Sequence, residues 1–318
     1  MHQSERDIPL SYDVDIVVAG GSSGAVAAAR AAARAGARVF LAAPFTYLGE
    51  DLCATLRLFT SRPQDPEPGL SERLFGGDAS LTPLHVKRTL DGVLMDAGVE
   101  FLFGCFVSDL IVDAEGRPSG VVMANRCGRQ AVRARAIIDA TPRATVARIA
   151  WADFDPYPAG PHAFERVVVG GQPKEGAGIE SEVLDVEITD TEEKPHNVIH
   201  YRLKLPMKDS SHQSFARAEQ MARDLTFDPA QVDASEVLFE VPPDSMEGRA
   251  RIEGEWPGSD GADINAFRPS DVDNLFVLGG CADLDRRAAR RLLEPEPFIG
   301  IGKRIGSEAA AWAEKREK

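Results

Sequence analysis

Short apolar runs and a long segment of small residues alternate in the N-terminal part of the chain. Residues 16–18 are apolar and are followed by Gly20 and Gly21, after which an alanine-rich segment continues to Arg34. A second apolar run covers residues 39–41. This order predicts a strand, a tight glycine turn, a helix and a second strand, which together make one βαβ unit.

The apolar periodicity changes twice in the next segment. Residues 81–97 have the spacing of an amphipathic helix, with Thr82 as its expected N-cap. Residues 99–140 alternate or run apolar between turn signals, which predicts a parallel strand, a small meander and a return strand over residues 136–140. A short helix over residues 144–154 is expected next.

A proline- and glycine-rich junction at residues 155–161 separates this region from a second strand-rich segment. There we expect an antiparallel sheet with one helix and one more strand, from residues 164–205, 214–225 and 237–241. We therefore predict an α/β protein with two domains. A Rossmann-like nucleotide-binding domain, a parallel sheet with a β-meander insertion, comprises residues 13–160 and 265–318, and a smaller mixed antiparallel-sheet substrate or cap domain comprises residues 161–264.

Composition narrows the classes of partner. The 318 residues include 36 Lys and Arg and 50 Asp and Glu, a net charge of −14, which argues against nucleic acid and anionic membranes as partners. No apolar run approaches the ~18 residues of a membrane-spanning helix, and the polar N-terminus is unlike a signal peptide. The four cysteines show no paired spacing, so we expect no disulfide, no metal and a cytoplasmic protein.

The glycine turn carries the first candidate binding chemistry, because a helix N-terminus that follows such a turn binds phosphate groups through its free amides. Aligned on the last two glycines of the G-x-G-x-x-G pattern, the candidate cofactor-binding residues are Ala19, Gly20, Gly21, Ser22, Ser23 and Gly24. Two positions depart from the pattern. Ala19 replaces the first glycine, and Ala43, followed by Pro44, stands at the cofactor-binding position where an acid would hold the ribose.

The loop after the second strand indicates which protein family the chain resembles. The letters YLGED at residues 47–51 are followed by CATLR at residues 53–57. With the βαβ unit, they resemble the FAD-dependent oxidoreductases of the glutathione-reductase-like flavoprotein class. The resemblance implies FAD as the cofactor. It also implies positions for five loop residues, with Gly49, Glu50 and Asp51 near the ribityl chain and phosphates, and Thr55 and Arg57 near the isoalloxazine as candidate catalytic residues.

Three later stretches extend the resemblance. The letters IIDATP at residues 137–142 resemble the family's I-D-A-T-G segment with Pro142 in place of glycine, and residues 273–281 resemble its N-L-F-V-A-G-R-C strand. The last helix, expected to open at Gly302, is similar to the family's G-Q-A-A-G segment. By this resemblance, further cofactor contacts come from Val107, Ala140, Thr141, Gly279, Gly280, Gly302 and Lys303.

Two functions remain open from the sequence. The first is an FAD-dependent oxidoreductase that oxidises or reduces a small organic molecule by hydride transfer at flavin N5. The second is a non-catalytic or partner-dependent subunit that keeps the FAD-binding fold as a scaffold, in a homo- or hetero-oligomer. Four departures from the cofactor pattern motivate the second hypothesis: Ala19, Ala43, Pro142 and Gly280.

Overall fold

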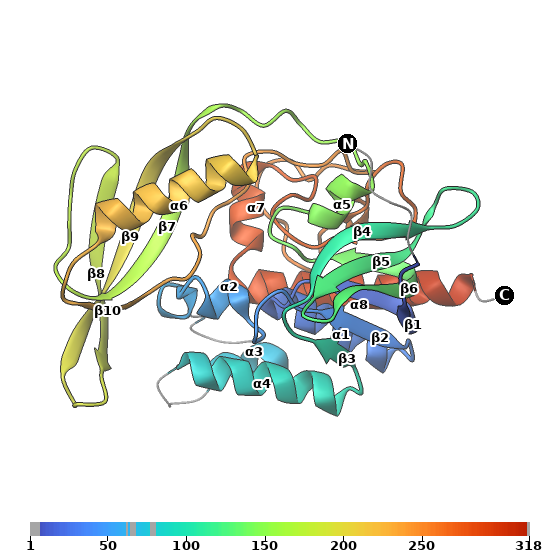
Figure 1. The fold of residues 1–318 in the computed structure, drawn as a ribbon, viewed down its shortest axis with the longest axis horizontal. Helices are drawn as coiled ribbons and strands as arrows, with labels where there is room; N and C mark the ends of the chain where they lie inside the picture. The colour runs from blue at the N-terminus through green and yellow to red at the C-terminus, as the bar shows by residue number, and fades with distance from the viewer. Residues whose placement is uncertain (1–6, 62, 64–67, 77–80, 317–318) are drawn as a thin grey trace.

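The computed structural model describes residues 7–61, 63, 68–76 and 81–316, which form two sheets with helices around them (Figure 1). Within these residues, the larger sheet has seven strands: β1 (Leu10–Ala19), β2 (Val39–Ala42), β3 (Glu100–Leu102), β4 (Phe106–Val112), β5 (Pro118–Asn125), β6 (Gly128–Asp139) and β11 (Leu275–Val277). The smaller sheet contains β7 (Gly160–Gly170), β8 (Ile179–Thr189), β9 (Pro195–Met207) and β10 (Gln231–Ala234).

The helices connect and cover these sheets. They are α1 (Ser23–Arg34), α2 (Glu50–Cys53), α3 (Leu70–Phe75), α4 (Pro83–Asp96), α5 (Thr145–Ile149), α6 (His212–Thr226), α7 (Arg286–Leu292) and α8 (Pro295–Lys315), with the short 3-10 helices η1 (Arg57–Phe59) and η2 (Ile264–Phe267). Thr82 caps α4 as expected, because its side chain accepts from the His85 amide.

The predicted βαβ unit is present as β1, α1 and β2. β1 pairs in parallel with β2, and β3 continues this arrangement at the edge of β2. On the other side of β1, β6 and then β11 also pair in parallel. Ile16 and Phe40 are fully buried, as is typical of parallel strands that are covered on both faces. The predicted fold class, α/β with a Rossmann-like parallel sheet, is confirmed.

The predicted meander is formed by β4, β5 and β6, which pair antiparallel in that order. β6 is longer than the return strand expected over residues 136–140. It is the last strand of the meander and, without interruption, the parallel partner of β1. The meander is thereby anchored to the centre of the larger sheet.

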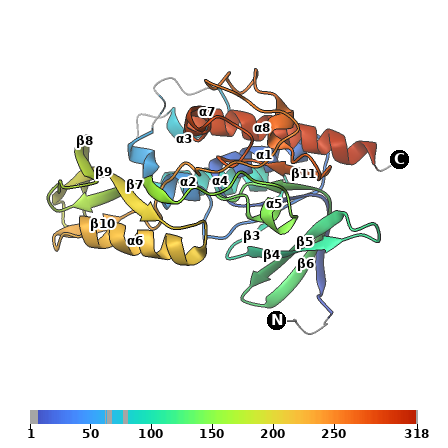
Figure 2. The same cartoon turned by 90° about the horizontal axis from the view of Figure 1, so that it is seen from above.

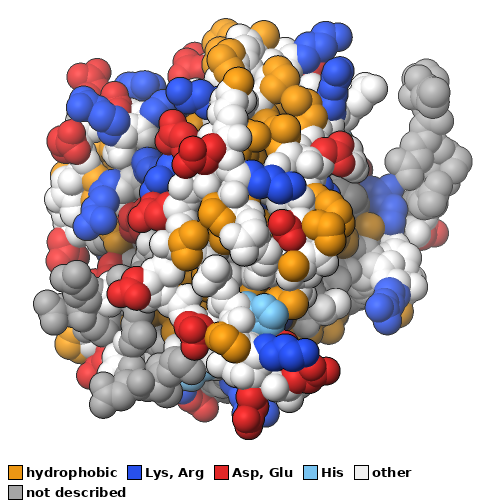
Figure 3. Space-filling view, turned by 90° about the vertical axis from the view of Figure 1, so that its left-hand side faces the viewer, with side chains coloured by type: hydrophobic (Ala, Val, Ile, Leu, Met, Phe, Trp, Pro, Cys, Tyr) orange, Lys and Arg blue, Asp and Glu red, His pale blue; other side chains and the backbone are white. Residues whose placement is uncertain are grey.

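The second sheet is antiparallel, in the order β10-β7-β9-β8. α6 packs on it, with Phe215 of the helix in one apolar cluster with Phe164 and Tyr201 of the sheet. Figure 1 places this unit opposite the larger sheet, with α2 and α7 between them. On the described part of its outer side, acidic, basic and apolar side chains are intermixed (Figure 3). The domain boundaries given above stay a prediction.

The last helix differs from the expectation. α8 begins at Pro295 and not at Gly302. Gly302 and Gly306 lie in its interior, where an added Cβ would overlap the carbonyl oxygens of Gly24 and Ala28 in α1. Close packing of α8 on α1 therefore explains these two glycines, and the two helices lie side by side in Figure 2.

Two shorter elements also correct the sequence analysis. α5 covers Thr145–Ile149 instead of residues 144–154, since Trp151 adopts a left-handed φ of 59° that ends the helix. Residues 237–241 form no strand. Phe239 makes one isolated bridge to Glu165, and the prolines at 242 and 243 cannot donate to a longer ladder. Among the described residues, no helix has the length and apolar character needed to cross a membrane.

Candidate functional site

The loop that follows β2 lies across the glycine turn. The Gly49 amide donates to the Gly21 carbonyl at 2.7 Å, which fixes the start of α2 beside the N-terminus of α1. Gly49 has a left-handed φ of 83°, and a Cβ there would lie 2.8 Å from the Leu90 side chain of α4. Both the left-handed backbone and the close packing against α4 therefore favour glycine at this position.

Two acids of this loop bind the amides of the turn. The Gly21 amide donates to Glu50 Oε1 at 2.8 Å, and the Ser23 amide donates to Asp51 Oδ1 at 2.8 Å. Ser23 Oγ donates to Asp51 Oδ2 at 2.5 Å. Since free amides at a helix N-terminus are an anion site, these carboxylates occupy the positions where the sequence predicts a pyrophosphate.

The two carboxyl groups lie in an environment that disfavours charge. Glu50 is 5% exposed, and its Oε2 atom has no hydrogen-bond partner in the described part of the chain. Burial raises the pKa of Glu50 to about 8, and the neighbouring Asp51 adds to the rise while the Gly21 amide opposes it. Burial also raises the pKa of Asp51, against the hydrogen bonds from Ser23.

The carboxyl end of β6 forms the next wall of the site. Asp139 is fully buried and accepts from the amide and hydroxyl of Thr141 at 3.0 and 2.6 Å, and from the Ala147 amide at 2.9 Å. Asp139 therefore fixes both Thr141 and the start of α5. After β11, a Cβ on Gly280 would lie 2.8 Å from Pro242. Glycine at this position therefore leaves room for the segment around Pro242, which leads back from the second sheet.

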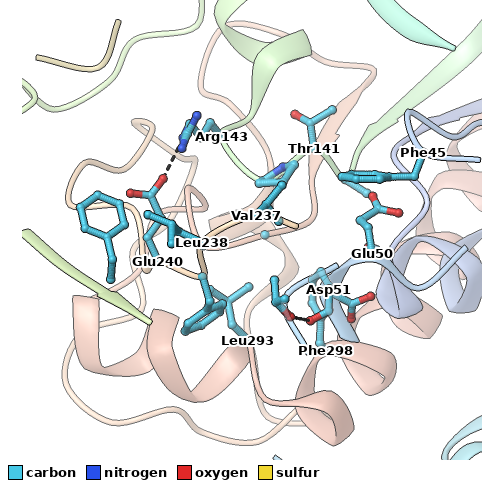
Figure 4. A pocket seen from close by; sticks show the side chains of 18 of the residues that line it. Phe45, Glu50, Asp51, Thr141, Arg143, Val237, Leu238, Glu240, Leu293 and Phe298 are labelled. Atoms are coloured by element: carbon cyan, nitrogen blue, oxygen red, sulfur yellow. Dashed lines mark hydrogen bonds and ion pairs between the residues drawn. The ribbon is translucent and has the colours of Figure 1, made fainter. Parts of the chain in front are cut away.

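These elements surround a cavity of about 230 Å³ between the two sheets (Figure 4). Its walls are mainly apolar, and five phenylalanines line it: Phe45, Phe164, Phe215, Phe239 and Phe298. Ligand pockets are commonly ~300–1,000 Å³. The cavity therefore admits a small molecule or part of a cofactor, but not a whole dinucleotide while the two acids stay in place.

A charged pair closes the cavity on the side of the second sheet. Arg143 Nε donates to Glu240 Oε1 at 2.7 Å, and the Arg143 guanidinium carbon lies 2.9 Å from the centre of the Phe215 ring. Burial raises the pKa of Glu240, although Arg143 opposes this rise. Figure 4 shows this pair on the side of the cavity opposite Glu50 and Asp51.

The two candidate catalytic residues lie in different surroundings. Thr55 lines the cavity, and its Oγ1 donates to the Asp51 carbonyl at 2.6 Å. The Arg57 side chain is 4% exposed and lies behind the wall, where it donates to the Leu293 carbonyl at 2.8 Å and pairs with Glu294 at 2.9 Å. Its guanidinium carbon lies 3.8 Å from the centre of the Phe239 ring.

The candidate cofactor-binding residues divide into two groups. Those that line the cavity are Ser22, Glu50, Asp51, Ala140, Thr141, Gly279 and Gly280. Those that lie around the turn, in the buried strand ends or elsewhere are Ala19, Gly20, Gly21, Ser23, Gly24, Ala43, Pro44, Gly49, Val107, Gly302 and Lys303. Val107 is in β4 at the outer edge of the meander, and the exposed Lys303 lines a different groove beside α1 and α8.

Sequence reasoning missed the aromatic lining. Phe298 lies in the first turn of α8, which the expected start at Gly302 excluded. Phe45 directly follows Pro44 and carries no motif of its own. Phe164, Phe215 and Phe239 come from three separate parts of the second unit, and no spacing in the sequence indicates that their side chains meet.

The backbone of the turn fits the pyrophosphate of a dinucleotide. Its amides bind two carboxylates in this structure, and carboxylate oxygens are stand-ins for phosphate oxygens. A Cβ on Gly21 would lie 2.7 Å from Glu50 Oε2, so this glycine lets an anionic group approach the backbone. Among the described residues, no group of three or more His, Cys, Asp or Glu side chains is arranged to hold a metal ion.

Comparison with known proteins agrees with this geometry. Residues 15–253 match the family described as FAD dependent oxidoreductase. No curated protein matches the chain. OxyS anhydrotetracycline hydroxylase from Streptomyces rimosus has a similar fold, with a TM-score of 0.53 and 13% identity over 96% of this chain and 63% of its own.

Two other solved structures show the same likeness. Para-nitrophenol 4-monooxygenase PnpA from Pseudomonas putida DLL-E4 has a TM-score of 0.51 and 12% identity, over 96% of this chain and 82% of its own. A ternary complex of aklavinone-11 hydroxylase with FAD and aklavinone has a TM-score of 0.51 and 14% identity, over 95% and 63%. The chain thus spans about 63% of the length of the first of these proteins, and identities this low establish the fold alone.

Proposed function

The chain belongs to the family of FAD-dependent oxidoreductases, and we propose that it oxidises or reduces a small, largely apolar organic molecule in the cavity between its two sheets. The observation that carries this proposal is the position of the cavity. It lies at the carboxyl ends of β6 and β11, where open α/β sheets bind ligands, and the glycine turn of β1 and α1 forms one wall.

In this proposal, the flavin supplies two-electron chemistry by accepting or giving a hydride at N5. The Gly21 amide of the glycine turn and the Ser23 amide of α1 would hold the pyrophosphate, and Thr141, fixed by Asp139, would contact the cofactor. The ribose has no acid at Ala43, so we expect weaker FAD binding than in a chain with that acid, by roughly tenfold to a hundredfold.

The second sheet supplies the substrate side of the site. Phe164, Phe215 and Phe239 exclude water and contact the apolar body of the substrate. Glu240 is an ionisable group of this wall, as is Glu219 of α6, and Arg143 holds the carboxyl of Glu240 in place. We assign to Glu240 the hydrogen bond that orients a polar group of the substrate.

The test is the visible absorption spectrum of the purified protein before and after addition of excess FAD. We expect flavin bands that elute with the protein, followed by their loss when a substrate reduces the flavin under anaerobic conditions. A protein that stays colourless after addition of FAD contradicts this function.

One observation favours the second hypothesis, a scaffold or partner-dependent subunit. The amides that would bind the pyrophosphate already donate to Glu50 and Asp51. If these contacts persist in solution in the presence of FAD, the fold acts as a scaffold without bound cofactor. A search for a partner chain then becomes the next experiment.

A further inference from the structure

The contacts of Glu50 and Asp51 go beyond ordinary helix capping. α1 already has an N-cap, because Ser22 Oγ accepts from the Ala25 amide at 3.2 Å. The two acids engage the Gly21 and Ser23 amides in addition. They reach these amides from the first turn of a separate helix, α2, so these hydrogen bonds are tertiary contacts between α2 and the glycine turn.

The contact of Glu50 is incomplete. Its Oε1 accepts from Gly21, while Oε2 is buried and has no hydrogen-bond partner among the described residues. A buried carboxyl oxygen without a partner costs free energy. The Glu50 side chain therefore occupies the site although one of its oxygens lacks a hydrogen bond. A ligand with more acceptor oxygens, such as a pyrophosphate, is a better partner for these amides.

We propose that the carboxyl groups of Glu50 and Asp51 occupy the phosphate subsite of the dinucleotide site, and that the pyrophosphate binds only when α2 withdraws these two side chains. The proposal rests on the proposed function, since it assumes that this turn binds FAD. It makes α2 the element that opens and closes the site.

The charge of Glu50 sets how strongly the pair opposes a phosphate. Below pH 8 the carboxyl is largely protonated, because burial raises its pKa to about 8, and above that pH it is an anion facing an incoming anion. Besides Asp51, the titratable groups near the pair are Tyr47, Cys53 and Arg57 in the same segment, Lys87 on α4, and Glu236 bonded to Tyr47. The described contacts from α1 are amides and the Ser23 hydroxyl, and α8 presents the apolar Phe298.

The experiment measures dissociation constants at pH 6.5 and pH 9 for the wild type and three variants. Glu50→Ala removes the occupant, Glu50→Gln removes its charge but keeps an acceptor for the Gly21 amide, and the exposed Glu72→Gln on α3 is the matched control. The probes are FAD, ADP, which carries the pyrophosphate without the flavin, and riboflavin, which carries the flavin without phosphate. Calorimetry and quenching of flavin fluorescence give the constants.

We expect wild-type affinity for FAD and ADP to fall at least tenfold from pH 6.5 to pH 9. Glu50→Ala should bind both at least tenfold more tightly than the wild type at pH 9, Glu50→Gln should lose most of the pH dependence, and Glu72→Gln should match the wild type. Riboflavin affinity should be the same in all four proteins.

Two outcomes overturn the proposal while the proposed function stands. One is tight FAD binding by the wild type with no effect of either Glu50 variant. The other is an equal gain for riboflavin, which shows a general loosening of the site. If no variant binds FAD or ADP at either pH, while thermal unfolding shows that all are folded, the proposed function fails and this inference fails with it.

Discussion

Gly302 of α8 lies against the backbone of Gly24 in α1, so closely that a Cβ on Gly302 would overlap the Gly24 carbonyl oxygen. We expect Gly302→Ala to lower the free energy of unfolding by about 1–3 kcal/mol, because no rotamer relieves an overlap with backbone. Gly92→Ala in α4 is the control. Its nearest neighbour is an arginine tip at 4.0 Å, so alanine should stabilise that helix by up to ~1 kcal/mol. Chemical denaturation measures both, and equal stability of Gly302→Ala and the wild type contradicts the packing.

Arg57 is expected to stabilise the fold by connecting η1 to the start of α8. Arg57→Ala leaves the Leu293 carbonyl and Glu294 without their buried partner, so we expect a loss of about 3 kcal/mol. Arg117→Ala removes an exposed ion pair with Asp113 and should leave the stability almost unchanged. Denaturation curves provide the comparison. An Arg57→Ala protein of normal stability that has lost activity would return Arg57 to a catalytic role.

The sequence was sufficient for the elements whose signals are local. The apolar runs around Gly20 and Gly21 predicted the βαβ unit, and Thr82 predicted the start of α4. These predictions succeed because capping and periodicity depend on residues a few positions apart. The predicted end of α5 was wrong because no local sequence signal indicates the left-handed conformation of Trp151, which ends the helix.

The site was harder to predict because its contacts cross the chain. The resemblance assigned Glu50, Asp51 and Thr141 to the cofactor site, and all three line one cavity. It did not indicate that the two acids bind the turn themselves, since this depends on how α2 docks on α1. Gly302 was interpreted as a helix start although it is a packing glycine, and glycine alone does not distinguish the two.

The stability of the protein should depend on the ionisation of Glu50. Its pKa is raised from 4.5 to about 8 in the folded state by burial, so the folded state binds this proton more tightly than the unfolded state. The free energy of unfolding should therefore fall as the pH rises from about 5 to about 8, by up to about 5 kcal/mol from this group. The difference between wild type and Glu50→Gln, measured by denaturation across this range, isolates the effect. A constant difference means that Glu50 does not titrate there.

Thiol reactivity should distinguish Cys127 from the other three cysteines. Cys127 is exposed, while Cys53, Cys105 and Cys281 are buried. Burial raises the pKa of Cys53 and of Cys281 to about 12, which removes the reactive thiolate at neutral pH. A chromogenic disulfide reagent should find one fast thiol in the native protein, none in Cys127→Ser, and four in the unfolded wild type. A second fast thiol in the native protein would show that one of the buried sites opens.

Glu240 should affect turnover without affecting the cofactor. Glu240 lies on the side of the cavity opposite Glu50 and Asp51, which bind the glycine turn. Glu240→Gln should therefore keep the flavin spectrum and lower kcat/KM at least tenfold, the effect of losing about 1.4 kcal/mol of substrate contact. Glu187→Gln, an exposed change on β8, should leave both unchanged. Loss of bound flavin from Glu240→Gln would indicate a role in the fold instead.

The pairing of β11 with β6, and of α8 with α1, determines the order in which the molecule can assemble. While the chain is being synthesised, the parallel sheet lacks an edge strand and α1 lacks its cover until residues 275–315 have emerged. The second sheet and α6 come from the contiguous residues 160–234 and meet no such delay. Folding of the nucleotide-binding half therefore waits for a long-range closure, and the nascent protein depends during that interval on protection of an exposed apolar surface.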